Sequence, residues 1–233
     1  MRLDVLTIFP EMFPGVIGAS IIKRAVEKGL VSLHVHDLRD WSKDKHRKVD
    51  DKPYGGGPGM VMRPDPFFDA VDDIKRRSQG RPRVILLSPQ GRRLTQPDVR
   101  RLSREPWLIL LCGHYEGIDE RVRVGLADEE LSIGDYVLTC GELPAMVLVD
   151  SVVRLVPGVL GDQASVVEES FSDHLLEYPQ YTRPPEYRGM RVPDILLCGD
   201  HSKISQWRRH QAERLTAEKR PDLIENGPTN SSD

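Results

Sequence analysis

Two apolar runs in the middle of the chain are each followed by a glycine-bearing polar loop, and this repeated arrangement constrains the fold most strongly. The runs are residues 108–112 and 131–133, and the loops are residues 113–117 and 134–141. A helical pattern begins after each loop. Strand, glycine loop and helix in succession are typical of an α/β protein that binds its ligand at the carboxyl ends of parallel strands.

A further loop, Ser88-Pro89-Gln90-Gly91, follows another apolar run at residues 84–87 and is the first of the three along the chain, so that residues 113–117 are the second loop and residues 134–141 the third. If the three strands are neighbours in a parallel sheet, their loops converge at one edge. Main-chain groups and apolar side chains there would suit an adenine-like ring. The loops contain no Lys or Arg and no glycine pattern typical of a phosphate cradle. Three ordinary turns between strands and helices are the alternative interpretation.

Local signals predict where several helices begin. Ser20 is expected to cap a helix over residues 21–28, Asp65-Pro66 to start a helix that runs to about residue 77, and Thr95 to cap a helix that ends by residue 104. His34 and His36 fall on one face of a predicted strand, where we interpret them as hydrogen-bonded strand residues rather than metal ligands.

Composition indicates a soluble protein of one large domain with a small appendage. The chain has 233 residues, 39% of them hydrophobic, and a formal net charge of −3. Its three cysteines show neither zinc-site spacing nor a Cys-x-x-Cys pair, which favours reduced thiols. Without a signal-peptide pattern or an apolar run of membrane-spanning length, we expect a cytoplasmic protein.

The chain divides by pattern into two domains. We expect a first domain at residues 1–160, a flexible linker at residues 161–172 that is acidic and serine-bearing, and a small helical domain at residues 173–233 that ends in a disordered tail.

Three segments favour RNA as a partner. Residues 39–63 form a polar, basic loop whose rings, including His46 and Tyr54, alternate with cations, which suits an unstacked base beside phosphates. Residues 75–104 hold ten Lys and Arg against one acid, and residues 203–220 hold six against two. Solvated helix faces are the alternative interpretation of both basic runs.

Eight motifs then follow one another along the chain: LTIFP (6–10), DDKPYGGGPGM (50–60), LSPQG (87–91), CGHYEG (112–117), SIGDYVL (132–138), GELPAM (141–146), PGVLG (157–161) and YTRP (181–184). In this order the chain resembles the bacterial tRNA (guanine-N1)-methyltransferases, the TrmD family of the SPOUT class. The motifs run from the first strand into the small domain, so the likeness covers nearly the whole chain.

The resemblance implies an α/β fold of the SPOUT type, in which a parallel sheet carries a C-terminal trefoil knot and a small helical C-terminal domain follows. It implies S-adenosyl-L-methionine bound in a bent shape inside the knot, and a homodimer with its active site at the interface. The expected substrate is a tRNA with G36-G37, methylated at N1 of guanosine 37. The family is also said to depend on Mg²⁺, although no metal-ligand cluster stands out in the sequence.

Site residues follow from the matching motifs. The expected cofactor-binding residues are Leu87, Ser88, Pro89, Gly113, Tyr115, Glu116, Gly117, Ser132, Ile133, Gly134, Tyr136, Leu138, Gly141 and Pro144. The expected substrate-binding residues are Glu116, Glu177, His46, Asp50 and Tyr54.

Catalysis at N1 of guanine needs a base, because N1 carries a proton and is a poor nucleophile until that proton leaves. By resemblance, Glu169 is the base and Arg154 stabilises the charge that develops on O6. The family usually has Asp where this chain has Glu169, one methylene longer, and Asp173 is the alternative base. On spacing alone, Glu169 and Glu116 are equally consistent with solvated acids, and Arg154 with a helix-terminal cation.

Two other functions remain open on the residues alone. The first is an RNA-binding protein without catalysis, in which Glu169 marks a retired site. The second is an enzyme that uses the same three loops to bind a small nucleotide substrate.

Overall fold

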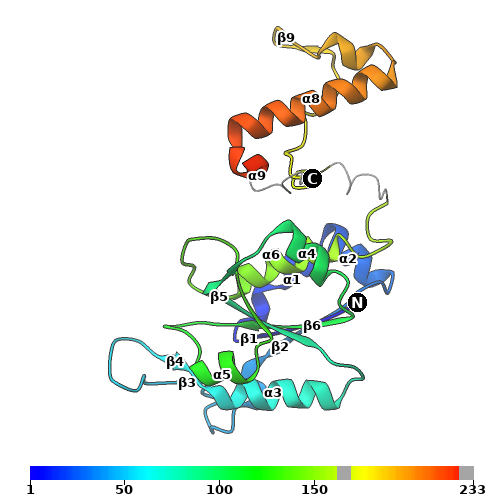
Figure 1. Ribbon diagram of the computed structural model, residues 1–233. Helices are drawn as coiled ribbons and strands as arrows, with labels where there is room; N and C mark the ends of the chain where they lie inside the picture. Colours follow the sequence, from blue (N-terminus) through cyan, green and yellow to red (C-terminus); the bar gives the residue numbers. More distant parts are fainter. Residues whose placement is uncertain (162–168, 226–233) are drawn as a thin grey trace, which may run out of the picture. The chain divides into compact units, whose positions relative to one another are not determined.

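The computed structural model describes residues 1–161 and 169–225, which divide into two compact units, Met1–Gly161 and Asp162–Asp233 (Figure 1). The first unit contains the expected first domain. Most of the expected linker, residues 162–168, and the expected tail, residues 226–233, lie outside the described residues.

The first unit is an α/β layer structure built on a five-stranded sheet. The strands are β1 (Arg2–Thr7), β2 (Ser32–Asp37), β5 (Arg83–Arg93), β6 (Trp107–Cys112) and β7 (Glu129–Ser132), in the order β2-β1-β6-β5-β7. Every neighbouring pair is parallel. The predicted parallel α/β sheet is therefore confirmed, and β5, β6 and β7 are neighbours.

Alternation along the central strand separates the core into two layers. In β6, Leu108 and Leu110 pack with α2 (Ser20–Glu27), α4 (Gln96–Leu102) and α6 (Glu142–Val153). Ile109 and Leu111 pack on the opposite face with α3 (Pro64–Arg76) and α5 (Glu120–Gly125). Figure 1 shows these two sets of helices on either side of the sheet. A strand buried on both faces reads as a continuous apolar run, as residues 108–112 do.

The observed start of one helix agrees with the sequence prediction, and the starts of two others differ from it. Thr95 is the N-cap of α4, as expected, and it forms a capping box with Asp98. The helix α3 begins at Pro64 rather than Pro66, because Pro64 already occupies the first helical position, where no backbone donor is needed. Ser20 is the first residue of α2 and not its cap, which is Ala19.

The strand β5 is longer than its apolar run predicts. Leu87 and Arg92 both pair with Leu131 of β7, so residues 88–91 protrude from one continuous strand. Where the strand resumes, a Cβ on Gly91 would lie 2.5 Å from the backbone nitrogen of Leu131. The apolar pattern ends at Leu87 because the strand beyond the loop consists of polar residues, Arg92 and Arg93, which pair with β7 through their main-chain groups.

Short elements complete the first unit. They are η1 (Pro10–Met12), α1 (Pro14–Ile17), η2 (Leu38–Trp41) and the antiparallel pair β3 (Asp50–Asp51) and β4 (Val61–Met62). The glycine and proline segment at residues 52–60, between β3 and β4, contains no helix or strand.

The second unit, which the sequence predicts to be helical, is built around the helix α8 (His201–Lys219). Asp200 caps this helix by accepting hydrogen bonds from the backbone nitrogens of Ser202 and Lys203, both at 3.1 Å. A short hairpin of β8 (Glu186–Tyr187) and β9 (Met190–Arg191), the turn η3 (Asp194–Leu197) and the helix α9 (Pro221–Glu225) accompany it. Among the described residues, no helix is long and apolar enough to cross a bilayer.

A buried carboxylate at the start of β1 links three strands. Asp4 is fully buried and accepts hydrogen bonds from Arg2 Nε at 2.6 Å and from Trp107 Nε1 at 2.7 Å, and it lies 2.7 Å from His36 Nε2. His36 is thus a paired strand histidine, as expected. Burial by itself raises the pKa of Asp4, but the hydrogen bonds from His36, Arg2 and Trp107 outweigh it and lower the pKa to about 2.

We predict that Asp4→Asn lowers the free energy of unfolding at pH 7 by about 2 kcal/mol, the value that this pKa shift implies. The folded pKa lies below the ordinary 3.8, so the stabilisation is complete above that value and is lost as the pH falls toward 2. Urea unfolding of both proteins from pH 7 to pH 2 should show the difference shrinking below pH 4. A difference that stays constant with pH would contradict the assignment.

Candidate functional site

A pocket of about 390 Å³ lies at the carboxyl ends of β5, β6 and β7. The loops that follow or interrupt these three strands form its walls. All fourteen residues that the sequence analysis expects to bind a cofactor line this pocket. The register of the sheet explains this convergence, because parallel neighbours bring their carboxyl ends to the same edge.

The pocket also has lining residues that the sequence analysis did not select, among them His114, Val137, Cys140 and Arg123. His114 and Cys140 lie inside the glycine loops, so their loop membership was a usable signal. Arg123 comes from α5, and nothing in its local sequence distinguishes it from a solvated helix residue.

The second and third loops cross in close contact. The backbone nitrogen of Gly141 donates to the carbonyl oxygen of Gly113 at 2.8 Å. A Cβ on Gly141 would lie 2.7 Å from the Gly113 nitrogen and 2.8 Å from the Cys112 Cα, so any larger residue would push the two chain segments apart. Glycine is required here for close backbone approach rather than for an unusual dihedral angle.

A buried acid lies immediately after this crossing. Glu142, in the first turn of α6, is fully buried, and Thr7 donates to its Oε1 at 2.5 Å. Thr7 Oγ1 also accepts from the backbone nitrogen of Phe9 at 2.8 Å. The position of a carboxylate at a helix N-terminus is favourable. This pair joins the end of β1 to the start of α6 and so fixes the end of the loop at residues 134–141.

The two cysteines beside Glu142 are poor nucleophiles. Cys112 is fully buried, and burial followed by the nearby Glu142 raises its pKa well above the ordinary value. Burial also raises the pKa of Cys140, with a smaller contribution from a hydrogen bond to Glu142. Since the thiolate is the reactive form, the pocket is not suited to covalent catalysis by cysteine.

The glycine and proline segment is attached to the wall of the pocket. Glu116 N donates to the carbonyl of Met60 at 3.0 Å, and Met62 N donates to that of Gly117 at 2.9 Å. A Cβ on Gly59 would lie 2.5 Å from Glu116 Cγ, so the absence of a side chain there leaves space for the glutamate. Burial and then Asp50 raise the pKa of Tyr115.

The expected substrate residues of the first unit therefore separate into two groups. Glu116 lines the pocket, and Asp50 lies close enough to Tyr115 to act on its charge. Tyr54 is fully exposed, and His46 is exposed in the turn of residues 44–47. Neither of these rings is among the lining residues.

The remaining expected residues lie at the end of α6 and in the second unit. Arg154 is the half-buried C-cap of α6. Glu169 and Glu177 belong to one turn of the second unit, where Glu177 N donates to Ser170 Oγ at 3.0 Å. Asp173, the alternative base, accepts a hydrogen bond from Arg209 Nη1 at 2.8 Å.

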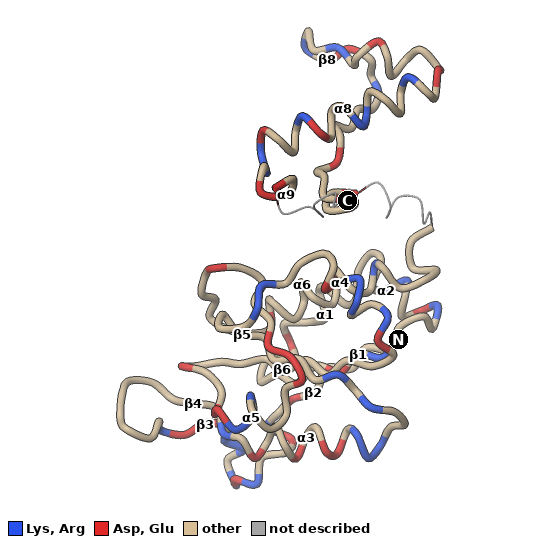
Figure 2. The backbone as a smooth tube through the Cα atoms, viewed as in Figure 1, with Lys and Arg blue, Asp and Glu red and all other residues tan. Residues whose placement is uncertain are grey.

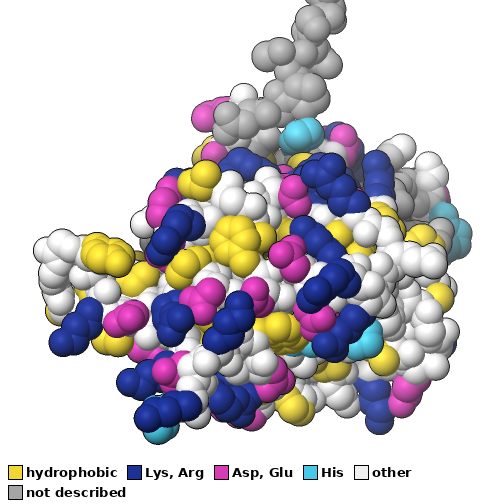
Figure 3. Space-filling model, turned by 90° about the horizontal axis from the view of Figure 1, so that it is seen from below, with side chains coloured by type: hydrophobic (Ala, Val, Ile, Leu, Met, Phe, Trp, Pro, Cys, Tyr) yellow, Lys and Arg dark blue, Asp and Glu magenta, His cyan; other side chains and the backbone are white. Residues whose placement is uncertain are grey.

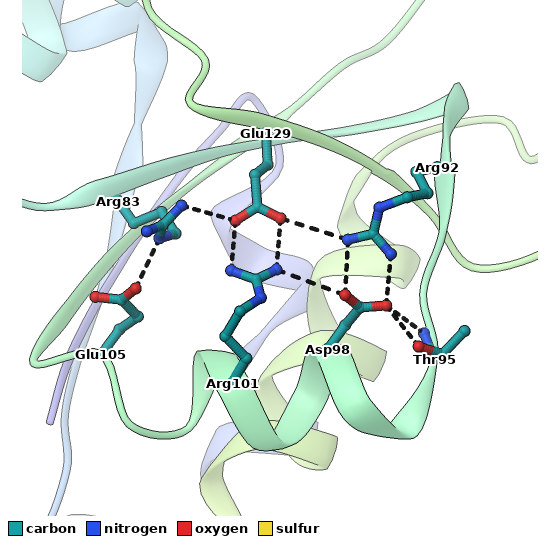
Figure 4. A network of polar contacts seen from close by, with 7 residues as sticks. All are labelled: Arg83, Arg92, Thr95, Asp98, Arg101, Glu105 and Glu129. Atoms are coloured by element: carbon teal, nitrogen blue, oxygen red, sulfur yellow. Dashed lines mark hydrogen bonds and ion pairs between the residues drawn. The ribbon is translucent and has the colours of Figure 1, made fainter. Parts of the chain in front are cut away.

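Much of the basic run at residues 75–104 has a structural role. Figure 4 shows Glu129 of β7 bound by Arg101 at 2.6 Å and by Arg83 at 3.0 Å, and Asp98 bound by Arg92 at 2.7 Å. All three of these arginines thus pair with Glu129, an acid that lies outside the run. Figure 2 shows cations and anions interspersed along the backbone, and the face of the molecule in Figure 3 likewise carries both kinds of side chain.

Comparison with known proteins gives the same family as the motifs. A sequence profile described as tRNA (Guanine-1)-methyltransferase TrmD matches residues 1–226. The chain is 58% identical to the tRNA (guanine-N(1)-)-methyltransferase of Geobacillus kaustophilus strain HTA426 over 98% of its own length and 93% of the relative's. It is 56% identical to the protein of the same name from Bacillus cereus strain AH820, over 97% and 92% of the two lengths.

The chain belongs to the TrmD family. The family resemblance drawn from the eight motifs is confirmed, and the pocket at β5, β6 and β7 is formed by four of them: LSPQG, CGHYEG, SIGDYVL and GELPAM. In the described parts of the chain, no group of three or more His, Cys, Asp or Glu side chains is arranged to hold a metal ion.

We predict that Gly141→Ala lowers the free energy of unfolding by about 1–3 kcal/mol, the usual cost of overpacking. The added methyl group would overlap the backbone of Cys112 and Gly113. Gly15→Ala is the matched control, since a Cβ at that position of α1 meets nothing within 4 Å. Denaturant unfolding of the two variants should separate them, and equal stability would contradict a tight crossing at Gly141.

Proposed function

We propose that the chain is an S-adenosyl-L-methionine-dependent tRNA (guanine(37)-N(1))-methyltransferase. The observation that carries this proposal is the convergence of fourteen expected residues from three separate loops on one pocket, in a member of the TrmD family. A pocket of about 390 Å³ is within the range of small-molecule sites.

The lining suits the donor. Leu87, Leu138 and Pro144 supply apolar contacts for a flat ring, and the glycines of the second and third loops leave backbone groups accessible to its polar edge. When bound, the donor supplies a methyl group on a sulfonium centre. We propose that the three loops form a trefoil knot around it, an arrangement supported by the tight crossings at Gly91 and Gly141.

The chain's own groups then activate the guanine. Glu169 removes the N1 proton as a general base, and Arg154 stabilises the negative charge that spreads toward O6. Glu116 and Glu177 bind the edge of the base. Glu169 takes this role because its position matches the base of the family, and Asp173, which accepts a hydrogen bond from Arg209, is the alternative base. No step in this scheme requires magnesium.

The substrate we propose is a tRNA with G36-G37. Tyr54 is fully exposed on a glycine-rich loop, and the tip of that loop is free of helix and strand. His46 is exposed in a neighbouring basic turn. Exposed rings among cations can stack on unpaired bases while the cations contact phosphates.

We further propose a homodimer with the active site at its interface. The helix α6 is apolar on nearly every side, and its outward stripe carries Leu143 and Val147, which are 46% and 48% exposed. A helix that is apolar all round is typical of a fully buried element, so a second copy is the natural cover for this stripe. Arg154 lies at the end of the same helix.

We expect the protein to transfer a methyl group from labelled S-adenosyl-L-methionine to a G36-G37 tRNA, and to lose most of this activity in Glu169→Gln and Arg154→Ala. Loss of a general base typically costs about 10²–10⁴-fold in rate. Single-turnover assays with nuclease mapping of the modified position measure both the rate and the site.

The matched control is Asp173→Asn, which removes the alternative base. A larger loss in Asp173→Asn than in Glu169→Gln would reassign the base. Donor binding and tRNA binding without any methyl transfer by the wild type would favour the RNA-binding alternative, and turnover without RNA would favour a small-molecule substrate.

We expect Val147→Asp to dissociate the dimer, because it places a charge in the apolar stripe of α6. Val124→Asp is the control, since Val124 is 72% exposed on α5 and outside that stripe. Sedimentation velocity should show a monomer for the first variant and the wild-type species for the second. A wild-type protein that sediments as a monomer would contradict the proposed dimer.

A further inference from the structure

The turn that carries Glu169 and Glu177 has an unusual backbone. Within four residues, Phe171, Asp173 and His174 have φ values of +69°, +51° and +56°. Residues other than glycine rarely adopt positive φ angles, and for a bulky residue such as Phe171 this is a strained conformation. Such a turn keeps its shape only where its surroundings hold it.

Part of that support comes from within the turn. Phe171 N donates to the carbonyl of Leu175 at 2.7 Å, and Ser172 N donates to the carbonyl of Glu169 at 3.0 Å. Ser170 Oγ accepts from Glu177 N at 3.0 Å. These bonds link the segment that bears Glu169 to the segment that bears Glu177.

The rest of the support comes from α8 and its C-terminal end. Thr216 is fully buried, accepts from Leu176 N at 2.9 Å, and donates to the carbonyl of Ala212 at 2.6 Å. Arg209 donates to Asp173 at 2.8 Å, and the guanidinium of Arg220 lies 5.8 Å from the centre of the Phe171 ring. The buried hydroxyl group of Thr216 therefore has two hydrogen bonds, one within α8 and one to the backbone of the turn.

We propose that Thr216 and Arg209 are positioning residues, which hold the turn of residues 169–177 against α8 so that Glu169 and Glu177 reach the guanine from a fixed geometry. The inference rests on the proposed function, in which these two acids act on the base. Methyl transfer depends on orientation, so a turn that relaxes would slow the chemical step while leaving most tRNA contacts in place.

The test uses the full-length protein and two changes that loosen the turn without touching either acid. Thr216→Val keeps the shape of the side chain but leaves Leu176 N without its acceptor, and Thr216→Ser restores that acceptor. Arg209→Ala removes the hydrogen bond to Asp173.

The matched control for charge is Arg214→Ala on the same helix. Arg214 lies near Gln211 at 3.0 Å and Glu218 at 3.7 Å, and neither of these partners belongs to the turn. The measurements are the single-turnover rate of methyl transfer, the Kd for tRNA, and hydrogen exchange at the Leu176 amide.

We expect Thr216→Val and Arg209→Ala to lower the single-turnover rate by about tenfold or more, with faster exchange at Leu176 in Thr216→Val. The rate should recover in Thr216→Ser. The Kd for tRNA should change no more in Arg209→Ala than in Arg214→Ala, and the single-turnover rate at saturating tRNA should fall further in Arg209→Ala than in Arg214→Ala.

Three results would overturn the inference. The first is faster exchange at Leu176 in Thr216→Val together with a wild-type rate. The second is an equal effect of Arg209→Ala and Arg214→Ala that is confined to the Kd. The third is methyl transfer that is lost in Glu169→Gln but unchanged in Thr216→Val and Arg209→Ala, which contradicts the positioning alone. Methyl transfer that survives Glu169→Gln would instead contradict the base assignment in the proposed function.

Discussion

The backbone contact between Gly113 and Gly141 is the constraint on which the pocket depends. The third loop can close the site only by passing over the end of β6 within hydrogen-bond distance, and only residues without a side chain permit that approach. The buried pair of Thr7 and Glu142 then holds the start of α6 in place. The shape of the pocket is thus set by main-chain packing, which leaves its lining side chains available for a ligand.

In the function that we propose, residues of both units take part in the chemistry. The first unit supplies the pocket and the C-cap residue Arg154, and the second supplies the turn with Glu169 and Glu177. Because that turn takes its shape from α8, the second unit contributes to orientation as well as to contacts with RNA in the function that we propose. This arrangement makes residues remote from the guanine relevant to the rate of methyl transfer.

The tertiary structure decides which charged residues form ion pairs, more than their order along the chain does. The basic run at residues 75–104 contains a single acid, yet Arg83 and Arg101 pair with Glu129, which comes from a later strand. In β1, Asp4 is hydrogen-bonded to Trp107 and His36, which are far from it in sequence. A count of charges along the chain therefore predicts neither the positive surface nor the buried network.

The sequence by itself determined the parallel α/β sheet, its three glycine loops and the family, because apolar periodicity, glycine and motif order are local signals. Fourteen of the residues that line the pocket followed from the motifs of the family. Only the tertiary structure decided that β5 resumes beyond its loop, that Glu142 is buried against Thr7, and that α8 holds the turn at residues 169–177. Each of these depends on contacts between segments distant in sequence, which no local pattern encodes.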